Sequence, residues 1–486
     1  MDAQFDLLHA VADPVGAGAA SVAPAPAPRA SVPAAADGPR LAEVLVSLSH
    51  ALDLAEGQPA GHAQRSCWIA QQLGRAIGLG TQQLRELYYT ALLKDAGGSS
   101  NAARIRTLFL TDDLSFKRHR RTAGLSLPSL MHFVLRHTGL NAGPLTRLRV
   151  VVNAVQNGGE IHRELTEARS SRGAQVARQL HFGEDVAEGI QALDEQWDGS
   201  GQPQGLAGKE IPLYSRIVLL AQVADAFHAV AGPQATREEV ARRSGRWFDP
   251  RIADAFAVLA RDAGFWRQLA SDDLARRLIE IEPAPQAPPV DDDTLDEIAV
   301  AFGQIVDAKS SCTAGHSARV ALISDQVGTR LGLAAHERRW LRRGALLHDV
   351  GMLGVSNQIL DKPGRLDPAE WAVVQRHALH TEQILERVGA FGALARIAGA
   401  HHERLDGSGY PRGLAARHVG LETRIITVAD AFDALIADRP WRAALSADQA
   451  LQVMRDGVGT AFDADCVAAL ERSLGALGEF SAFGAL

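Results

Sequence analysis

The sequence has little of what builds disulfide frameworks, zinc fingers or membrane spans. Its 486 residues include only three cysteines, Cys67, Cys312 and Cys466, which lie far apart in the chain. Disulfide scaffolds and structural zinc sites need paired or closely spaced cysteines, so neither is expected, and a reducing cytoplasm is the predicted location. No apolar run approaches the roughly 18 residues of a membrane span, and the N-terminus lacks a signal-peptide pattern. We therefore expect no membrane partner.

Positive charge is also scarce. The formal net charge is −7 and the pI is near 6.2, which argues against a chain that coats nucleic acid polymers. The short basic run at residues 117–121 (KRHRR) is more typical of a solvated face than of a nucleic-acid site. With 46% hydrophobic and 22% charged residues, the chain is apolar enough for two sizeable cores.

Two proline-rich stretches divide the chain. Residues 1–40 form an Ala/Pro-rich leader that cannot bury enough surface to fold, so we predict disorder there. Residues 283–294 have the composition of a linker. The predicted domains are therefore 41–282 and 295–486.

Apolar residues in both domains recur at helical spacing, and alternating strand-like runs are rare. Gly78 and Gly332 each follow an amphipathic segment and predict helix ends. Asp367, followed by Pro368 and Glu370, predicts a helix start. The predicted fold class is all-α in both halves.

Histidine and aspartate residues gather in the second half in a pattern that can hold metal. His348 and Asp349 are adjacent, His401 and His402 follow as a second pair, and Asp430 comes later. His316 upstream and His377 between the pairs complete the set. Imidazoles supply nitrogen ligands, and one carboxylate can bridge two ions that act on a single phosphate. The pattern predicts a dinuclear hydrolytic site.

An internal repeat connects the two halves. Segments of the first half match segments of the second half in the same order, which indicates a duplication. The matches are residues 61–65 with 315–319, 91–97 (ALLKDAG) with 345–351 (ALLHDVG), 197–203 (WDGSGQP) with 405–411 (LDGSGYP), and 223–227 (VADAF) with 428–432 (VADAF).

These motifs make the second half resemble an HD-GYP domain, the phosphodiesterase branch of the HD phosphohydrolase superfamily. The resemblance is carried by residues 346–351 (LLHDVG), 401–404 (HHER), 406–411 (DGSGYP) and 428–430 (VAD), and it covers nearly all of residues 300–470. It implies two tandem HD-type helical domains, the first degenerate. It also implies hydrolysis of a cyclic dinucleotide, most often cyclic di-GMP, in bacterial second-messenger signalling, with iron or manganese ions as cofactors.

The resemblance also implies a role for each site residue. His348 and Asp349 would be catalytic, and Asp349 would bridge the two ions. Arg439, Arg442, Tyr410 and Pro411 match positions that bind or surround the substrate. The metal ligands would be His316, His348, Asp349 and Asp430 for one ion, and Asp349, His377, His401 and His402 for the other.

Two positions depart from the family pattern. Met352 stands where a lysine is expected to contact phosphate, and a thioether carries no charge and donates no hydrogen bond. Cys312 stands where members with three metals have a glutamate, so two divalent ions are expected rather than three.

The first half keeps His62, Asp95 and Asp225 but not the other ligand positions. Lys94 replaces the motif histidine, Leu193 and Asp194 replace the histidine pair, Gln202 replaces the tyrosine, and Gly173 aligns with His377. Lys94 is expected near Asp95 and Asp225, because buried acids need a partner. We interpret this half as a regulatory, non-catalytic domain.

Two function classes remain open. The favoured one is a metal-dependent phosphodiesterase whose partner is a cyclic dinucleotide. The other is a weak or inactive signalling module that acts through nucleotide or protein binding, for which Met352 is the main argument; another phosphorylated nucleotide is the alternative substrate. The sequence does not show whether the chain has signalling-protein partners. It also does not show whether the chain is a monomer or a homodimer.

Replacing Met352 by lysine tests the missing phosphate contact. Met352→Lys adds a cation toward the substrate phosphate, and hydrogen bonds to charged groups stabilise by about 1.5–3 kcal/mol, so kcat/KM for a cyclic dinucleotide should rise about tenfold. Steady-state kinetics on protein of verified metal content measures this. Unchanged kinetics at full metal content would exclude a simple missing contact.

Overall fold

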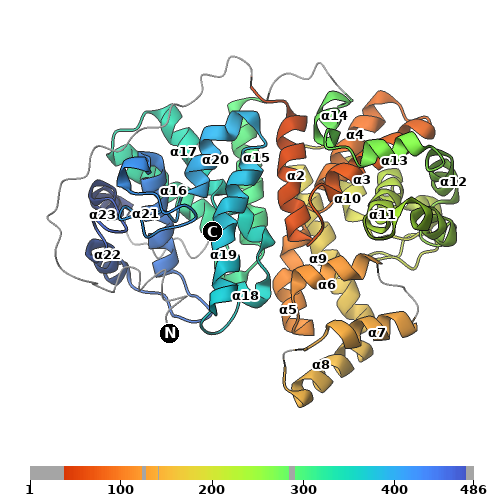
Figure 1. The fold of residues 1–486 in the computed structure, drawn as a ribbon, viewed down its shortest axis with the longest axis horizontal. Coiled ribbons are helices and arrows are strands. Elements are labelled where there is room, and N and C mark those ends of the chain that lie inside the picture. The colour runs from red at the N-terminus through yellow and green to blue at the C-terminus, as the bar shows by residue number, and fades with distance from the viewer. Residues whose placement is uncertain (1–37, 123–126, 141, 284–289, 478–486) are drawn as a thin grey trace. The chain divides into compact units, whose positions relative to one another are not determined.

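The computed structural model describes residues 38–122, 127–140, 142–283 and 290–477. Its backbone contacts divide the chain into two compact units, which meet in sequence between Thr294 and Leu295. Residues 1–37 of the predicted leader and residues 284–289 of the predicted linker lie outside the described residues. Each unit is built from helices, and in the described ranges the only β pairing consists of isolated bridges, which confirms the all-α prediction (Figure 1).

The N-terminal unit begins at Pro39 and contains helices of both α and 3-10 type. Their bounds are α2 Leu41–Ala55, α3 His62–Ala76, α4 Thr81–Leu93, η1 Gly98–Asn101, α5 Ala102–Phe109, α6 Asp113–Thr122, α7 Leu127–His137, α8 Pro144–Gln156, α9 Gly158–Gln179, α10 Glu184–Gln191, η2 Gly208–Glu210, α11 Leu213–Arg243, α12 Pro250–Leu259, α13 Ala263–Leu269 and α14 Leu274–Glu280. Helix α3 packs against α4 and α11 in the core of this unit.

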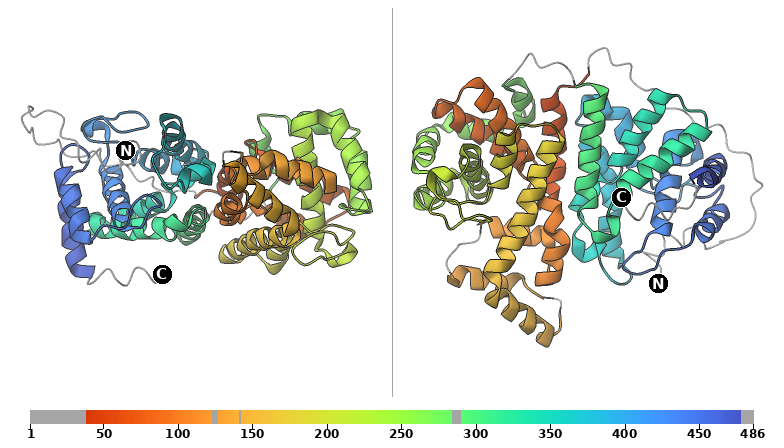
Figure 2. Two further views of the ribbon diagram at one scale, coloured as in Figure 1. Left: turned by 90° about the horizontal axis from the view of Figure 1, so that it is seen from below. Right: turned by 180° about the vertical axis from the view of Figure 1, so that it is seen from behind.

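The C-terminal unit repeats this plan with fewer helices. Their bounds are α15 Asp292–Asp307, η3 Ser311–Thr313, α16 His316–Arg330, α17 Ala335–Leu347, η4 Val350–Gly354, α18 Asn357–Leu360, α19 Pro368–Leu385, η5 Gly389–Phe391, α20 Gly392–Gly399, η6 Ala416–His418, α21 Leu421–Ile436, α22 Ala447–Asp456 and α23 Ala464–Leu477. Helix α16 packs against α17 and α21, and α19 packs against α20 (Figure 2).

The predicted helix ends are confirmed. Gly78 and Gly332 follow the ends of α3 and α16 with φ of 84° and 76°, a conformation that glycine adopts without steric cost. Helix α19 begins at Pro368, and the Asp367 carboxylate accepts hydrogen bonds from the first-turn N–H groups of Ala369 and Glu370, both at 2.9 Å.

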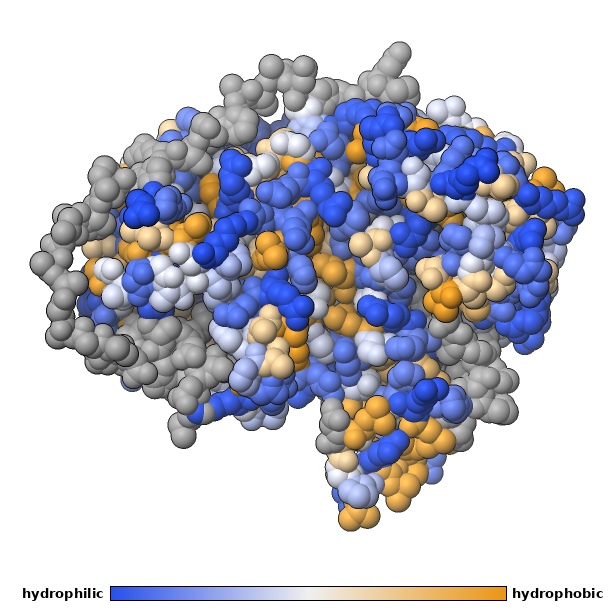
Figure 3. Space-filling model, in the orientation of Figure 1, coloured by the Kyte–Doolittle hydropathy of each residue, from blue (hydrophilic) through white to orange (hydrophobic). Residues whose placement is uncertain are grey.

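Helix α8 has an apolar face that the rest of its unit does not cover. It exposes apolar side chains along one face, at Leu145, Leu148, Val152 and Val155, with Leu145 74% exposed. Figure 3 shows hydrophobic residues gathered at the tip formed by α7 and α8.

Among the described residues, only α11 is long and apolar enough, by length and composition, to cross a membrane. The apolar window of this helix is 67% buried inside the protein, as in a core helix. Its backbone also leaves helical geometry at Gly232, directly before Pro233, so that two helices meet at a kink.

Candidate metal centre

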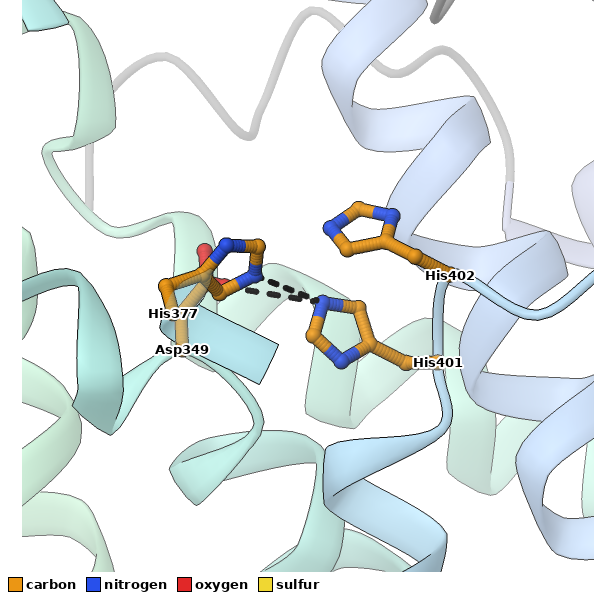
Figure 4. Close-up of side chains that lie close together, drawn as sticks. All are labelled: Asp349, His377, His401 and His402. Atoms are coloured by element: carbon orange, nitrogen blue, oxygen red, sulfur yellow. Dashed lines mark hydrogen bonds and ion pairs between the residues drawn. The ribbon is translucent and has the colours of Figure 1, made fainter. Parts of the chain in front are cut away.

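The seven predicted metal ligands converge in the C-terminal unit, although they come from distant parts of the sequence. They form two groups, each with ligand atoms within 4.8 Å of one another. The groups are His316, His348 and Asp430, and Asp349, His377, His401 and His402. Figure 4 shows the second group, with the side chains of His377, His401 and His402 close to Asp349.

Asp349 lies between the two groups and turns one carboxylate oxygen toward each. Its Oδ2 is 3.5 Å from His348 Nε2 and 3.8 Å from His316 Nε2. Its Oδ1 is 3.3 Å from His377 Nε2 and 3.6 Å from His401 Nε2. One carboxylate is therefore placed where it could be shared by two ions, as predicted for a bridging ligand.

Local structure explains how the histidines reach this point. His316 is the first residue of α16, after Gly315 at φ 69°, and His348 ends α17. His377 lies within α19, whereas His401 and His402 follow directly after α20. Helix ends and one helix face thus aim side chains at a common centre.

Hydrogen bonds on the far side of each ring fix which nitrogen faces the centre. The Nδ1 atoms of His348, His377 and His401 lie 2.6, 2.5 and 2.6 Å from the backbone carbonyl oxygens of the residues three positions earlier. A carbonyl only accepts, so each Nδ1 carries the proton and donates it. The Nε2 atoms are then left for a metal ion.

The nitrogen and oxygen atoms at this centre are arranged to bind a cation rather than to bond to one another. Nε2 of His348 and Oδ1 of Asp349 are buried without a hydrogen-bond partner. The Nε2 atoms of His377 and His401 face each other at 3.4 Å, where they can share one proton or ligate one ion. Divalent metal binding satisfies these atoms.

The ligand histidines divide into two classes by the direction of their pKa shifts. Burial, followed by the charge of neighbouring imidazoles, lowers the pKa of His401 and of His402 well below the usual range. Burial alone would raise the pKa of Asp349, but the nearby His348 and His377 hold it well below its usual value. Burial would lower the pKa of His316 and of His377 too, but Asp430 and Asp433 raise that of His316 to about 10, and Asp349 raises that of His377. These two imidazoles therefore release a proton when a metal ion binds, whereas His401, His402 and Asp349 are already in the forms that ligate metal.

A cavity of about 160 Å³ opens onto this centre. His316, Asp349, His377, His402 and Asp430 line it, whereas His348 and His401 are buried behind them. Its remaining walls are largely apolar, and they include Val306, Leu360, Trp371 and Leu435.

The predicted substrate residues are placed unequally. Tyr410 lines the cavity and stacks on His402 at 4.7 Å between ring centroids, whereas Pro411 is not among the lining residues. Arg439 and Arg442 both line it, but Arg442 already donates to the carbonyl oxygen of Ala434 at 2.9 Å. Arg439 is therefore the better placed of the two arginines for a phosphate.

The two departures from the family pattern also face the cavity. Met352 and Cys312 both line it, so neither is remote from a bound substrate. Met352 in addition packs against an apolar cluster of Val355, Leu366 and Val374.

Sequence reasoning missed three supporting residues. Asp433 Oδ2 lies 2.7 Å from His316 Nδ1, which directs His316 Nε2 toward the centre. The hydroxyl of Thr381 donates to the carbonyl of His348 at 2.9 Å, and Glu403 accepts from the backbone N–H groups of residues 412 and 414. The position of Asp433 one helical turn after Asp430 was a signal that could have revealed its role.

The same contact in the N-terminal unit corrects the register of the repeat. His62 Nδ1 lies 2.7 Å from Asp225 Oδ2, as His316 does from Asp433. Asp225 therefore corresponds to Asp433, and the predicted match with Asp430 was wrong by one helical turn. Short sequence similarity had favoured the shifted pairing.

A second correction concerns the counterpart of His377. A Cβ on Gly351 would lie 2.1 Å from the carbonyl oxygen of His377, and a Cβ on Gly97 would lie 1.9 Å from that of Arg169. This close helix approach places Arg169, not Gly173, opposite His377. Residues of the N-terminal unit at the seven ligand positions are His62, Lys94, Asp95, Arg169, Leu193, Asp194 and Gln222.

Basic side chains occupy the place of the metal ligands in the N-terminal unit. Lys94 forms a buried ion pair with Asp95, as predicted. Arg169 pairs with Asp194 and lies 3.4 Å from Asp95. Asp225 is instead held by His62 and by Arg65 at 2.6 Å, so the expectation that Lys94 also compensates Asp225 was wrong. Within the described ranges, groups suited to a metal occur only in the C-terminal unit.

Comparisons with known proteins agree with this geometry. A sequence model of the HD domain family matches residues 148–252 and 301–466. The 3'3'-cGAMP-specific phosphodiesterase 3 of Vibrio cholerae is 49% identical over 437 residues, which cover 90% of this chain and 95% of that protein. The cyclic di-GMP phosphodiesterase response regulator RpfG of Xanthomonas campestris is 37% identical over 37% of this chain and 49% of its own length. A crystal structure of a cyclic GMP-AMP specific phosphodiesterase from V. cholerae aligns with a TM-score of 0.63 and 44% identity over 90% of this chain and 98% of that one.

Removing the shared carboxylate tests the bridging arrangement. Asp349→Ala should lose nearly all bound iron or manganese, from about two ions per chain, because both ions would lose a common ligand. Elemental analysis of anaerobically purified protein measures the content. Asp325→Ala, which removes a carboxylate of α16 paired with Arg342 at 2.9 Å, is the matched control and should keep its metal. Retention of both ions in Asp349→Ala would refute the bridge.

Asp433 should act by positioning His316. In Asp433→Asn the ring loses its anionic partner, and loss of such a partner typically weakens metal affinity about 10- to 100-fold. Competition with a chelator measures the affinity, and thermal unfolding separates it from a general loss of stability. Asp225→Asn, the equivalent change in the N-terminal unit, should leave metal affinity unaltered. Equal affinities in both variants would show that Asp433 has no positioning role.

Proposed function

The chain belongs to the HD-GYP branch of the HD-domain family and is a phosphoric diester hydrolase that acts on cyclic dinucleotides, and we propose that its preferred substrate is 3'3'-cGAMP rather than cyclic di-GMP. This proposal rests on the share of the chain over which each relative matches. The cGAMP-specific relative matches across both halves and 90% of the chain, whereas RpfG matches over 37%. The proposed preference for 3'3'-cGAMP replaces the preference for cyclic di-GMP that was expected from the family alone.

Two divalent ions, iron or manganese, are the proposed cofactors, with Asp349 and the six other candidate residues as ligands. When bound, such ions lower the pKa of water and offset charge that develops on the phosphoryl oxygens. The protein itself holds the imidazoles in the required tautomer through its backbone carbonyls. Its preorganised site therefore needs little rearrangement during the reaction.

Substrate placement would rest on the cavity walls. Arg439 at the cavity suits a phosphate oxygen, because a guanidinium donates in a planar fork. The Tyr410 hydroxyl is buried without a hydrogen-bond partner, and burial, followed by the charges of Asp430 and Asp349, raises its pKa well above the usual value. Tyr410 thus remains a neutral donor toward the substrate.

The N-terminal unit has a proposed regulatory role without chemistry of its own. Its ligand positions carry Lys94 and Arg169, whose charges replace those of metal ions. A cytoplasmic location is likewise a proposal, based on the scarcity of cysteine and on the class of substrate.

Comparing two substrates tests the proposed preference. Protein loaded anaerobically with manganese or ferrous iron should hydrolyse 3'3'-cGAMP with a kcat/KM at least about tenfold above that for cyclic di-GMP. Chromatography of the products gives both rates, and Asp349→Ala serves as the inactive control. An equal or reversed preference would contradict the proposal.

The second candidate function is a binding module without turnover, favoured by Met352 in the cavity. The same assay separates the two functions. Tight nucleotide binding with full metal content and no hydrolysis of either substrate would support the binding module and overturn the enzyme.

A further inference from the structure

The N-terminal unit contains a cavity of about 550 Å³, larger than the one at the candidate metal centre. The volume falls within the range of about 300–1,000 Å³ that is usual for sites of small organic ligands. Its lining includes the aromatic side chains of Phe109, Phe116, Phe133 and Trp247.

The corrected register shows that this cavity occupies the place of the metal-centre cavity in the second half. Matched positions of the repeat line both cavities. The pairs are Glu56 with Ser310, Arg169 with His377, Asp194 with His402, Gln222 with Asp430, and Val223 with Ala431. Duplication thus left a pocket in the first half while its metal ligands were replaced.

The first half has α5 to α8 between η1 and α9, where the second half has only α18 between η4 and α19, and this longer connection enlarges the pocket. Helices α5 to α9 contribute a separate apolar cluster around it, which includes Ile105, Phe109, Phe116, Phe133 and Ile161. Because the cluster faces a cavity and not a closed core, it offers an apolar and aromatic surface to a ligand.

Charge around the cavity leaves one cation in excess. The charged lining residues are three cations, Lys117, Arg120 and Arg169, and two carboxylates, Glu56 and Asp194. Lys117 and Arg169 both interact with these acids or with backbone carbonyls. Arg120 forms no hydrogen bond or ion pair with another described residue. The basic run at residues 117–121, expected to be a solvated face, thus sends two side chains to this cavity.

Two further features suit a ligand. Asn101 is buried, donates from Nδ2 to the Leu165 carbonyl at 3.2 Å, and leaves its Oδ1 buried without a partner. Helix α9 begins at the cavity with Gly158 and Gly159, and the positive end of a helix dipole favours an anion.

We propose that this cavity is a non-catalytic binding site for a small organic anion with one negative charge and an aromatic body that carries a hydrogen-bond donor. Arg120 binds the anionic group, the phenylalanine cluster packs against the aromatic body, and Asn101 Oδ1 accepts from its donor. A phosphodiester of a nucleotide and an aromatic carboxylate share this chemistry. The proposal does not depend on the activity of the C-terminal unit.

Calorimetric titration of the full chain tests the site with two probes, 3',5'-cyclic GMP and indole-3-acetate, each of which carries one negative charge and an aromatic ring system with an N–H donor. The chain carries Asp349→Asn so that the nucleotide is not consumed. Cyclic GMP can also enter the C-terminal cavity, so the readout for this probe is the loss of one class of sites while the other remains. The probe that responds identifies the phosphodiester or the carboxylate as the source of the anion.

Three variants, each combined with Asp349→Asn, test whether the probes bind in the N-terminal cavity. Arg120→Gln should weaken binding at the site about tenfold or more, because a hydrogen bond to a charged group is lost. Gly159→Trp should weaken it at least about tenfold, since Gly159 lines the cavity, is exposed and has no atom within 4 Å of a Cβ placed on it, so that the indole has room to obstruct the opening. Arg149→Gln, at an exposed arginine of α8 away from the cavity, is the matched control and should bind normally.

Thermal unfolding verifies that each variant is folded. If Arg120→Gln does not fold, binding by Gly159→Trp tests the proposal instead. The proposal is overturned if neither probe binds, or if all three variants bind both probes equally. Metal-dependent hydrolysis, measured on the chain without Asp349→Asn, reports separately on the proposed function.

Discussion

Compensation of buried carboxylates is the constraint on which both halves of this protein depend. A carboxylate removed from water needs a positive partner, because its desolvation costs several kcal/mol. In the C-terminal unit, Asp349 and Asp430 lie among imidazoles whose Nε2 atoms face the same centre, so divalent metal ions can supply the positive charge that the two carboxylates need. In the N-terminal unit, Lys94 and Arg169 supply that charge permanently.

This difference affects the chemistry that each half can perform and not its fold. An ammonium or guanidinium group neutralises an acid but cannot activate water as a metal ion does. The fold around the site is nevertheless preserved: His62 contacts Asp225 as His316 contacts Asp433. A duplicated domain can thus lose its reaction while it keeps its packing and a cavity at the same place.

Orientation in the C-terminal site comes from groups that touch no substrate. Backbone carbonyls fix the tautomers of His348, His377 and His401, and Asp433 does so for His316. Because these acceptors belong to helices or helix ends, the packing of α16, α19 and α21 determines where each ligand atom lies. The fold is therefore part of the site and not only its support.

The sequence by itself determined the helical class, the ends of several helices and the set of candidate ligands, because these depend on local spacing and on motifs read along the chain. Gly332, Pro368 and the His348 and Asp349 pair are examples. Only the tertiary structure decided which residues of the two halves correspond. A shift of one helical turn leaves the sequence pattern almost unchanged, and contacts across the fold were needed to match Asp225 with Asp433 and Arg169 with His377. The N-terminal cavity was likewise beyond the sequence, because its walls come from helices whose side chains meet only after folding.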